Sequence, residues 1–311
     1  MKVAAVSLTY NDDYKFDEWY NHYENYKDDI FIHIIVDNNS NIEYFEKLKN
    51  SFKDSHIIRR ESNGGCTGAY NDGIRYALSI AEVDAVMLIG NDISLKKDTI
   101  SILYKTLFSN SKIGMVAPIL LNKQTNIVED FGCEISASLM MIPYCEGSNY
   151  TDLKEDINYC ESVTGGSNLA RRDFYETVVG LQDENLFMYS DEVDMGIRSK
   201  QNGYIMASLK NAVCYHEHIN NNIKTGRRGL YTKYLAGRNK VYIAKKHFGI
   251  LKISYVFSFY FFGSIFRIFQ NLFKGDFNRI QEYLWLIFGA VMGLIGNMKA
   301  NKFSVPKKNS N

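Results

Sequence analysis

The chain has 311 residues, a net charge of +1 at neutral pH and 14% aromatic residues, with only 3 Pro. This length suits one large domain with an appendage, the small net charge gives no field of the kind that nucleic-acid binding uses, and the aromatic content excludes a disordered chain. The five cysteines lack CxxC spacing, and the N-terminal MKVAAVSLTYND has no long apolar segment. We therefore expect a reducing, cytoplasmic setting and no secretory signal.

Strands and helices are predicted to alternate through the first third of the chain. Short apolar or β-branched runs predict strands at residues 2–8, 31–36, 55–59, 84–89 and 113–119. Helical spacing predicts helices at 13–26, 42–52, 69–80 and 99–108. This alternation is typical of βαβ units, so we expect an α/β fold with a mostly parallel sheet flanked by helices.

Polar residues follow three of the predicted strands. Ligands of such sheets bind beyond the carboxyl ends of the strands, so Thr9, Asp37 and Asp92 should converge on one crevice. Asp37 could accept a hydrogen bond from a nucleobase imide, and Asp92 could hold a hard divalent cation. Each signal is weak alone, because Asn-Asp pairs after strands are mostly turns.

The Gly-rich turn at residues 63–68 precedes a predicted helix and would let backbone approach a ligand closely. It is neither GxGxxG nor GxxxxGK, so it supports neither a Rossmann dinucleotide site nor a P-loop. Residues 123–159 are irregular and should form hairpins and loops, and a Gly-rich segment at 162–170 precedes a helix expected near Asp173.

Residues 186–218 contain an acidic cluster and then a predicted helix, a Gly turn, a strand and two histidines, His216 and His218. The cluster packs Asp191, Glu192 and Asp194 into four positions, and carboxylates this close cannot all ionise cheaply if buried. A solvated helix start, which favours acidic residues, is the simpler interpretation. A catalytic base beside a metal-ligand histidine is the sharper one.

The region after residue 225 differs in composition. Residues 231–248 predict an aromatic and basic helix, and residues 255–266 and 283–298 are strongly apolar, each shorter than the roughly 20 residues of a spanning helix. Lysines and arginines flank both apolar runs. A helical hairpin packed on the main domain is one interpretation, and helices lying in the interface of an anionic membrane fit the Trp, Tyr, Phe and Lys mixture better. A pair of transmembrane helices is the third alternative.

Together these motifs resemble family 2 inverting glycosyltransferases with the GT-A fold. The matching pieces, in the family's order, are SLTYND, IIVDNNS, NGGCTGAYNDG, MLIGNDI, TGGSNLARRD and MYSDEVDMGIRSKQNGY followed by YHEH. They cover residues 2–218, and the segment LAGRNKVYIAKKHF with its apolar helices is similar to the rhamnosyltransferase-like and galactofuranosyltransferase-like branch. The resemblance implies a catalytic domain at 1–225 and a helical, membrane-associating region at 226–311.

The resemblance also implies residue roles. Asp37 would bind a uracil or thymine ring, with Thr9, Tyr10 and Asn11 lining the nucleoside. The donor's ribose and diphosphate side would meet Asn63, Gly65, Asn71, Asn91 and Asp92. Asp92 and His216 would ligate Mn²⁺ or Mg²⁺, His218 would be solvated, and Gly165 and Gly166, with Asp194, would stand on the acceptor side.

Two departures from the family's pattern bear on these roles. Gly90 occupies the position of the first acid of the DxD motif, so Asp92 must carry most of the metal binding. The family's Glu-Asp pair is inverted here, as Asp191-Glu192. Alignment favours Glu192 as the base, and some rhamnosyltransferase-like relatives place their essential Asp at the position of Asp191, so both are retained.

The expected activity is transfer of a hexosyl or deoxyhexosyl group from a UDP- or dTDP-sugar to a hydroxyl of a glycan or lipid-linked glycan. The expected location is the inner face of the cell membrane, with a homo-oligomer possible. Two alternatives stay open: a non-catalytic member that binds a nucleotide sugar or glycan, and a nucleotidyltransferase with a similar sheet, against which the acidic pair and downstream histidine argue.

Overall fold

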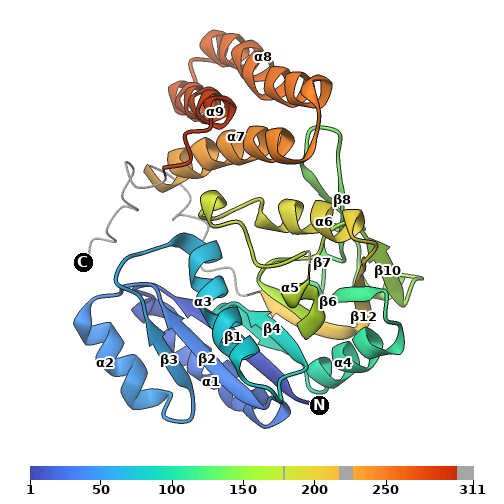
Figure 1. Cartoon of the computed structure of the whole chain (residues 1–311). Helices are drawn as coiled ribbons and strands as arrows, with labels where there is room; N and C mark the ends of the chain where they lie inside the picture. Colours follow the sequence, from blue (N-terminus) through green and yellow to red (C-terminus); the bar gives the residue numbers. More distant parts are fainter. Residues whose placement is uncertain (178, 217–226, 300–311) are drawn as a thin grey trace. The chain divides into compact units, whose positions relative to one another are not determined.

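The structure is a computed structural model that describes residues 1–177, 179–216 and 227–299 (Figure 1). The chain forms two compact units, and each is described by itself. The first comprises Met1–Glu134, Met141–Glu184 and Met195–His218. The second comprises Ile135–Met140, Asn185–Asp194 and Ile219–Asn311. The second unit thus contains two short internal segments besides the C-terminal region.

The described part of the first unit is built on a ten-stranded sheet. Its main path runs in the order β10 (Ile157–Cys160), β12 (Ile205–His216), β6 (Ile113–Asn122), β11 (Ser167–Arg171), β4 (Ala85–Ile89), β1 (Val3–Thr9), β2 (Ile32–Asp37) and β3 (His56–Arg59). Two short strands join the path at its side: β5 (Ile93–Leu95) pairs with β12, and β7 (Val128–Asp130) pairs with β6. A separate pair is formed by β8 (Cys133–Ile135) and β9 (Met141–Pro143).

The strands β3, β2, β1 and β4 are mutually parallel, as the alternating pattern predicts. β6 and β12 are also parallel to each other, whereas β11 runs antiparallel to both of its neighbours, β4 and β6. This strand was not expected, because the segment was predicted only as a Gly-rich stretch before a helix. Its sequence, SNLAR, lacks β-branched residues, and pairing on both edges overrides that weak propensity.

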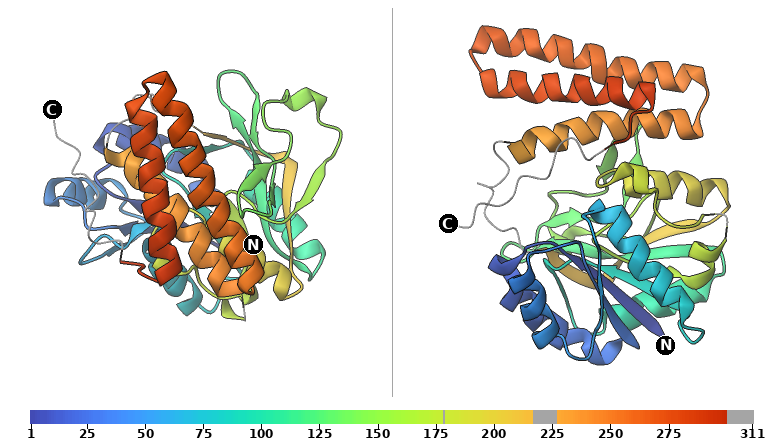
Figure 2. Two further views of the ribbon diagram at one scale, coloured as in Figure 1. Left: turned by 90° about the horizontal axis from the view of Figure 1, so that it is seen from above. Right: turned by 60° about the vertical axis from the view of Figure 1, so that its left-hand side comes forward.

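Helices cover both faces of this sheet (Figures 1 and 2). They are α1 (Phe16–Tyr26), α2 (Ile42–Ser51), α3 (Gly65–Ser79), α4 (Thr99–Ser109) and α5 (Arg172–Glu176), with single 3₁₀ turns at η1 (Asp13–Lys15), η2 (Lys27–Asp29), η3 (Tyr150–Asp152) and η4 (Glu184–Leu186). Along β1, Val3 and Ala5 face one apolar cluster while Ala4 and Val6 face the other. This alternation is the period of a strand buried on both faces.

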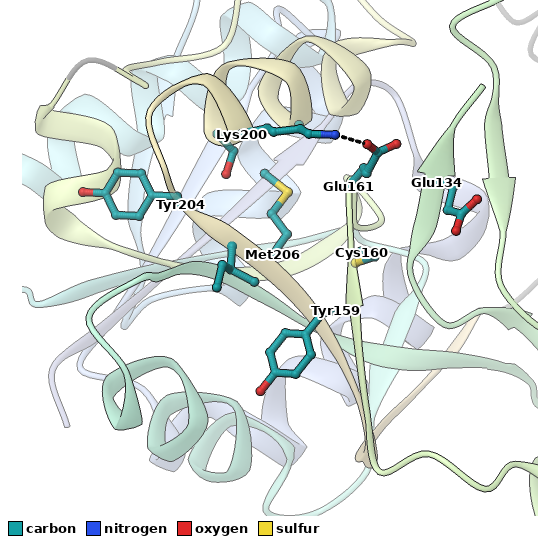
Figure 3. Close-up of a pocket in the computed structure, with 10 residues that line it drawn as sticks. Glu134, Tyr159, Cys160, Glu161, Lys200, Tyr204 and Met206 are labelled. Atoms are coloured by element: carbon teal, nitrogen blue, oxygen red, sulfur yellow. Dashed lines mark hydrogen bonds and ion pairs between the residues drawn. The ribbon is translucent and has the colours of Figure 1, made fainter. Parts of the chain in front are cut away.

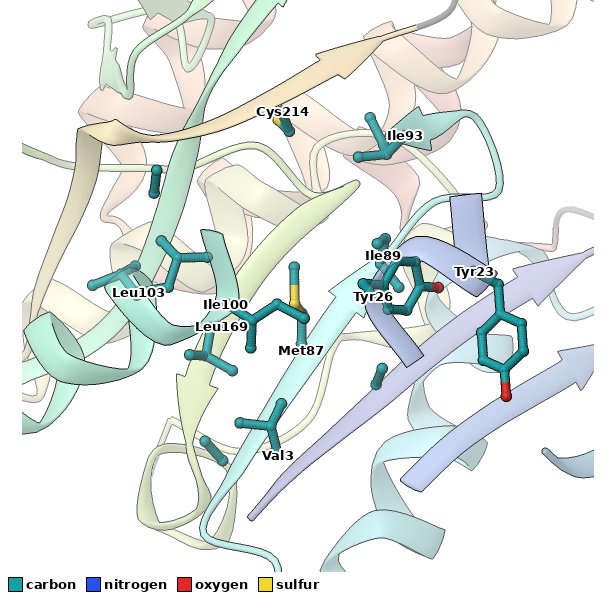
Figure 4. Close-up of a cluster of buried hydrophobic side chains, with 14 of the residues drawn as sticks. Val3, Tyr23, Tyr26, Met87, Ile89, Ile93, Ile100, Leu103, Leu169 and Cys214 are labelled. Atoms are coloured by element: carbon teal, nitrogen blue, oxygen red, sulfur yellow. The ribbon is translucent and has the colours of Figure 1, made fainter. Parts of the chain in front are cut away.

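The first of these clusters joins β1, β4 and β11 to α1, α2 and α4 (Figure 4). Met87 and Leu169, from adjacent strands, lie there beside Ile100 and Leu103 of α4. Such burial supplies most of the favourable free energy of folding. It also fixes the carboxyl ends of β1 and β4, next to which the polar residues of the predicted site lie.

The second unit contains three long helices, α7 (Arg227–His247), α8 (Ile250–Lys274) and α9 (Phe277–Ile295), which lie side by side in Figure 2. Glycines bring α7 and α9 into backbone contact. A Cβ at Gly289 would clash with the Tyr234 carbonyl oxygen, and one at Gly293 would clash with that of Arg238. Only glycine permits this approach.

The helix α8 is longer than the apolar run from which it was predicted. An 18-residue window of this 25-residue helix has a mean hydropathy of 1.2, and among the described residues α8 is the one helix long and apolar enough to cross a membrane by length and composition alone. Its apolar side chains are largely exposed within the unit, including Phe262 at 61%, Phe266 at 64% and Phe273 at 91%.

Candidate active site

The carboxyl ends of β1 and β2 place Thr9 and Asp37 side by side, because the two residues are partners in the parallel register. Asp37 is fully buried, and its Oδ1 accepts a hydrogen bond from the Ser40 backbone N–H at 3.2 Å. Burial raises the pKa of Asp37, while Ser40 and the nearby Arg59 guanidinium act in the opposite direction. A carboxylate in this position can accept a hydrogen bond from a ligand N–H.

Asp12 connects the end of β1 to the segment after β4. Its Oδ2 accepts hydrogen bonds from the Tyr10 backbone N–H at 3.2 Å and from Asn91 Nδ2 at 2.9 Å. Asn11 is tied to the next strand end, since its backbone N–H donates to Ser40 Oγ at 2.9 Å. The predicted residues Tyr10, Asn11 and Asn91 therefore gather at one sheet edge, with Asp12, which was not predicted, as their link.

Asn38 fixes the Gly-rich turn at this edge. Its Nδ2 donates to Asn63 Oδ1 and to the Gly65 carbonyl, both at 3.0 Å. Gly65 has φ of +73° and begins α3, four residues earlier than the predicted helix start. The left-handed backbone requires glycine there, and the N–H groups of a first helical turn suit an anionic ligand.

Asn71 occupies a different environment. It is 1% exposed, its Nδ2 donates to the Gln182 carbonyl at 2.9 Å and to Glu184 Oε1 at 3.0 Å, and its Oδ1 accepts from the Gln182 N–H. These bonds tie α3 to residues 182–184. Contact between Asn71 and a donor stays a prediction.

The predicted acceptor turn lies beside the end of β4. The Gly90 N–H donates to the Gly166 carbonyl at 2.7 Å, and Asn168 Nδ2 donates to the Thr164 carbonyl at 2.9 Å. A Cβ at Gly166 would meet no atom within 4 Å, so space opens at this turn. The Gly165-Gly166 turn is thus held against the Asn91-Asp92 segment.

Asp92 and His216 meet at the other side of the same edge. His216 Nε2 lies 3.6 Å from Asp92 Oδ2, and His216 Nδ1 lies 3.7 Å from Glu129 Oε2. Lys15, which is 8% exposed, places its Nζ 3.5 Å from the same Asp92 oxygen. Neither Glu129 nor Lys15 was predicted. His218 lies outside the described residues.

Electrostatics couples these groups. Burial alone would raise the pKa of Asp92, but the His216 hydrogen bond and the positive charges of Lys15 and His216 outweigh it and hold that pKa well below its usual range. The hydrogen bond to Asp92 raises the pKa of His216, against an opposing effect of burial. Asp92 therefore stays an anion at neutral pH.

The side-chain atoms of Asp92 and His216 are of the types that ligate divalent cations. A carboxylate oxygen and an imidazole nitrogen are ligands that Mn²⁺ accepts, and sites of this class take their remaining ligands from substrate phosphates and water. No group of three or more His, Cys, Asp or Glu side chains with metal-binding geometry occurs in the described part of the chain. A cation would also have to displace the Lys15 ammonium from Asp92.

The acidic cluster begins α6 (Asp191–Gln201), and its three carboxylates belong to the second unit. Asp191 is 6% exposed, and burial, followed by the charge of Glu192, raises its pKa well above the ordinary value. Burial lowers the pKa of Lys240 on α7 to about 8, although the charges of Glu192 and Asp191 act to raise it. A carboxyl with a raised pKa suits proton transfer near neutral pH.

Asp194 is an anchor between α6 and α7. It is fully buried, and its Oδ1 lies 2.6 Å from His247 Nε2 and 2.9 Å from Lys246 Nζ. A buried carboxylate needs such partners to stay charged. These contacts give Asp194 a structural role, and its predicted place on the acceptor side stays a prediction.

A cavity of about 510 Å³ lies in the first unit, beside the Glu161–Lys200 ion pair of 2.6 Å (Figure 3). No predicted site residue lines it. The lining residues are Glu134, Tyr159, Cys160, Glu161, Gly196, Ser199, Lys200, Tyr204, Ile205 and Met206.

Comparisons with known proteins match part of this chain to a described family. Residues 10–129 match the family model described as Glycosyl transferase family 2. The low-salt glycan biosynthesis hexosyltransferase Agl10 of Haloferax volcanii is 24% identical over 171 residues, which cover 54% of this chain and 53% of the relative. The chain therefore spans about half the length of that curated relative.

Solved structures show the same fold. The mannosyltransferase PcManGT of Pyrobaculum calidifontis, in complex with GDP-Man and Mn²⁺, has a TM-score of 0.56 at 12% identity and covers 94% of this chain and 87% of its own. GalNAc-T7 with UDP, GalNAc and Mn²⁺ also has a TM-score of 0.56 at 12% identity, covering 78% and 50%. The predicted GT-A fold with C-terminal helices is confirmed. The family match is confined to residues 10–129, and at 12% identity the solved structures show the fold alone.

Proposed function

We propose that the protein is an inverting glycosyltransferase that moves a hexosyl or deoxyhexosyl group from a UDP- or dTDP-sugar to a hydroxyl of a glycan or lipid-linked glycan. The observation that carries this proposal is the gathering of Thr9, Asp37, Asn91, Asp92 and His216 at one sheet edge, within and beside the residues that match the family. A rhamnosyl or galactofuranosyl donor is one version of it.

In this proposal the donor binds along the carboxyl ends of β1, β2 and β4. Asp37 accepts the imide N–H of the base, and Thr9, Tyr10 and Asn11 line the nucleoside. Asn63, Gly65 and Asn71 stand on the ribose and diphosphate side, where the α3 N-terminus favours negative charge.

Asp92 and His216 would hold Mn²⁺ or Mg²⁺, which when bound neutralises charge on the departing nucleoside diphosphate. The chain itself adds the Lys15 ammonium beside Asp92. A cationic side chain near the diphosphate would stabilise the negative charge that develops on it as it departs.

Glu192 or Asp191 would act as the general base. The carboxylate removes the proton of the acceptor hydroxyl while that oxygen forms a bond to the anomeric carbon and the bond to the diphosphate oxygen breaks. One displacement inverts the anomeric configuration. The raised pKa of Asp191 supports its candidacy, and the resemblance of this motif to the family's pattern supports Glu192.

A non-catalytic nucleotide-sugar or glycan-binding role is the alternative, and one observation favours it. Gly90 stands where the family has its first DxD acid, and Lys15 already neutralises Asp92. Such a protein would bind a UDP-sugar without transferring it.

A panel of UDP- and dTDP-sugars, each tested with Mn²⁺ for hydrolysis and for transfer to glycan acceptors, distinguishes the two roles. We expect turnover of at least one donor and, by NMR, a product whose anomeric configuration is opposite to that of the donor. Retention of configuration would contradict the inverting mechanism. Binding by calorimetry without turnover across the panel would favour the alternative.

We further propose that the exposed faces of α8 and α9 lie on an anionic membrane surface. Large apolar side chains there are accompanied by Lys252, Arg267, Lys274 and Arg279. Apolar burial plus attraction of basic residues to acidic lipids is how interfacial helices bind. A membrane location would bring a lipid-linked acceptor to the enzyme.

Vesicle co-sedimentation tests this location. The whole protein should bind vesicles of mixed phosphatidylcholine and phosphatidylglycerol, and Phe266→Glu with Phe273→Glu should release it. Ile142→Glu, at an exposed apolar residue of the first unit, is the matched control. A protein that ignores the vesicles, or whose apolar face mediates a homo-oligomer by light scattering, would contradict the proposal.

A further inference from the structure

The segment before α6 has an unusual backbone. Phe187, Tyr189 and Ser190 all have positive φ, of 67°, 66° and 66°. Residues with a Cβ avoid this left-handed region, and three in four positions persist only where the surroundings impose them. Asp191 follows directly, so the backbone of this segment sets where the acidic pair begins.

Asn239 of α7 imposes this conformation through hydrogen bonds. Its Nδ2 donates to three backbone carbonyls of the segment, those of Leu186 at 3.1 Å, Met188 at 3.0 Å and Tyr189 at 2.8 Å. Carbonyls so close in sequence face one amide only when the chain between them is bent sharply.

Arg238 adds a second set of donors from the same helix. Its Nη2 donates to the carbonyls of Asn185 at 3.1 Å and Leu186 at 2.8 Å, and its Nε donates to Asn239 Oδ1 at 2.9 Å. Arg238 and Asn239 are both fully buried. Burying a guanidinium and an amide is costly unless their hydrogen bonds are made, and most of them are made to this segment, while Arg238 Nη1 donates to the Met298 carbonyl.

The helix α7 also holds the far side of the acidic pair. Lys246 and His247, about two turns beyond Arg238, bind Asp194. The helix α7 therefore holds the chain on both sides of Asp191 and Glu192. It binds segment 185–190 before them and Asp194 after them.

We propose that Arg238 and Asn239 are positioning residues, which hold segment 185–190 so that the Asp191–Glu192 pair takes one orientation for proton abstraction. This inference rests on the proposed function. In this role Arg238 and Asn239 make no contact with substrate. They act through the backbone that leads to the Asp191 and Glu192 carboxylates.

The test compares the full-length Asn239→Ala and Arg238→Lys variants with the wild-type protein. Misplacing a base lowers the chemical rate without touching the donor site, so kcat should fall roughly tenfold to a hundredfold while the donor KM and the affinity for UDP stay unchanged. Hydrogen exchange at the amides of residues 186–194 should accelerate. Lys245→Met, which removes the bond from α7 to the Leu294 carbonyl, should alter none of these quantities.

A compensating change separates positioning from general packing. Glycine adopts positive φ at little cost, so Ser190→Gly added to Asn239→Ala should recover part of the lost kcat. Unchanged kcat and exchange in both single variants, or an equal loss of UDP affinity, would overturn the proposal. If the wild type transfers no sugar while exchange still accelerates in the variants, the proposed function fails and the clamp itself stands.

Discussion

His216 Nε2 lies 3.6 Å from Asp92 Oδ2, which joins the last residue of β12 to the segment after β4. The two residues are more than a hundred positions apart in the chain, and β5, which pairs with β12 at His216, brings them together. This contact is the physical core of the candidate metal and diphosphate site.

Replacing either member of this pair should weaken metal binding. Asp92→Asn removes the anionic ligand and His216→Ala the imidazole, so each should lower the affinity for Mn²⁺ in the presence of UDP by at least about tenfold. Calorimetry measures it. Glu82→Gln, at an exposed acid of the first unit, is the control, and equal affinity in all four proteins would contradict the assignment.

Lys15→Met should have the opposite effect. The Lys15 ammonium neutralises Asp92 and repels a second cation, so its removal should tighten Mn²⁺ binding, by severalfold given the partial burial of the pair. At the same time, turnover without added metal should fall. Weaker Mn²⁺ binding in this variant would mean that Lys15 organises the site rather than competing in it.

The strands that carry this site were predictable, and several of its contacts were not. β1, β2 and β4 match their apolar runs to within one or two residues, because a strand buried on both faces is a continuous apolar segment. Asp12, Lys15 and Glu129 join the site through side-chain contacts with distant residues, such as Asp12 with Asn91. No local pattern records such contacts.

The second unit shows the same division. The apolar runs predicted helices, but α8 extends well beyond its run, because flanking polar residues such as Lys252 and Asn271 are compatible with helix. Nothing in the segment LAGRNKVYIAKKHF indicated that Arg238 and Asn239 bind the backbone before the acidic pair. That relationship depends on tertiary packing.

Close packing of α7 on α9 predicts a strong effect of one methyl group. Gly289→Ala and Gly293→Ala would each force a Cβ against a backbone carbonyl of α7, so the free energy of unfolding should fall by about 1–3 kcal/mol. Gly263→Ala on α8 meets no atom within 4 Å and should leave stability equal or higher by up to about 1 kcal/mol. Equal effects at Gly293 and Gly263, by urea unfolding, would contradict the backbone contact.

Lys240 predicts a specific pH dependence of stability. Its pKa is lowered to about 8 in the folded protein and is about 10.4 when unfolded. Between these values the unfolded chain binds more protons, so stability rises with pH. From about pH 7.5 to about pH 9.5 the wild type should gain about 2 kcal/mol relative to Lys240→Met.

Urea unfolding in a Trp19→Phe background isolates this effect, because Trp285 of the second unit is then the reporter. Lys245→Met, at an exposed lysine of the same helix, should follow the wild type. Parallel pH curves for the wild type and Lys240→Met would show that Lys240 is not buried in solution.

The most direct measurement is sugar transfer by Glu192→Gln and Asp191→Asn, tested separately, with UDP affinity measured alongside and Glu43→Gln as an exposed control. We predict that at least one of the two loses about a hundredfold or more in kcat while UDP affinity is unchanged, as removal of a general base requires. Wild-type transfer rates in both variants would contradict the account.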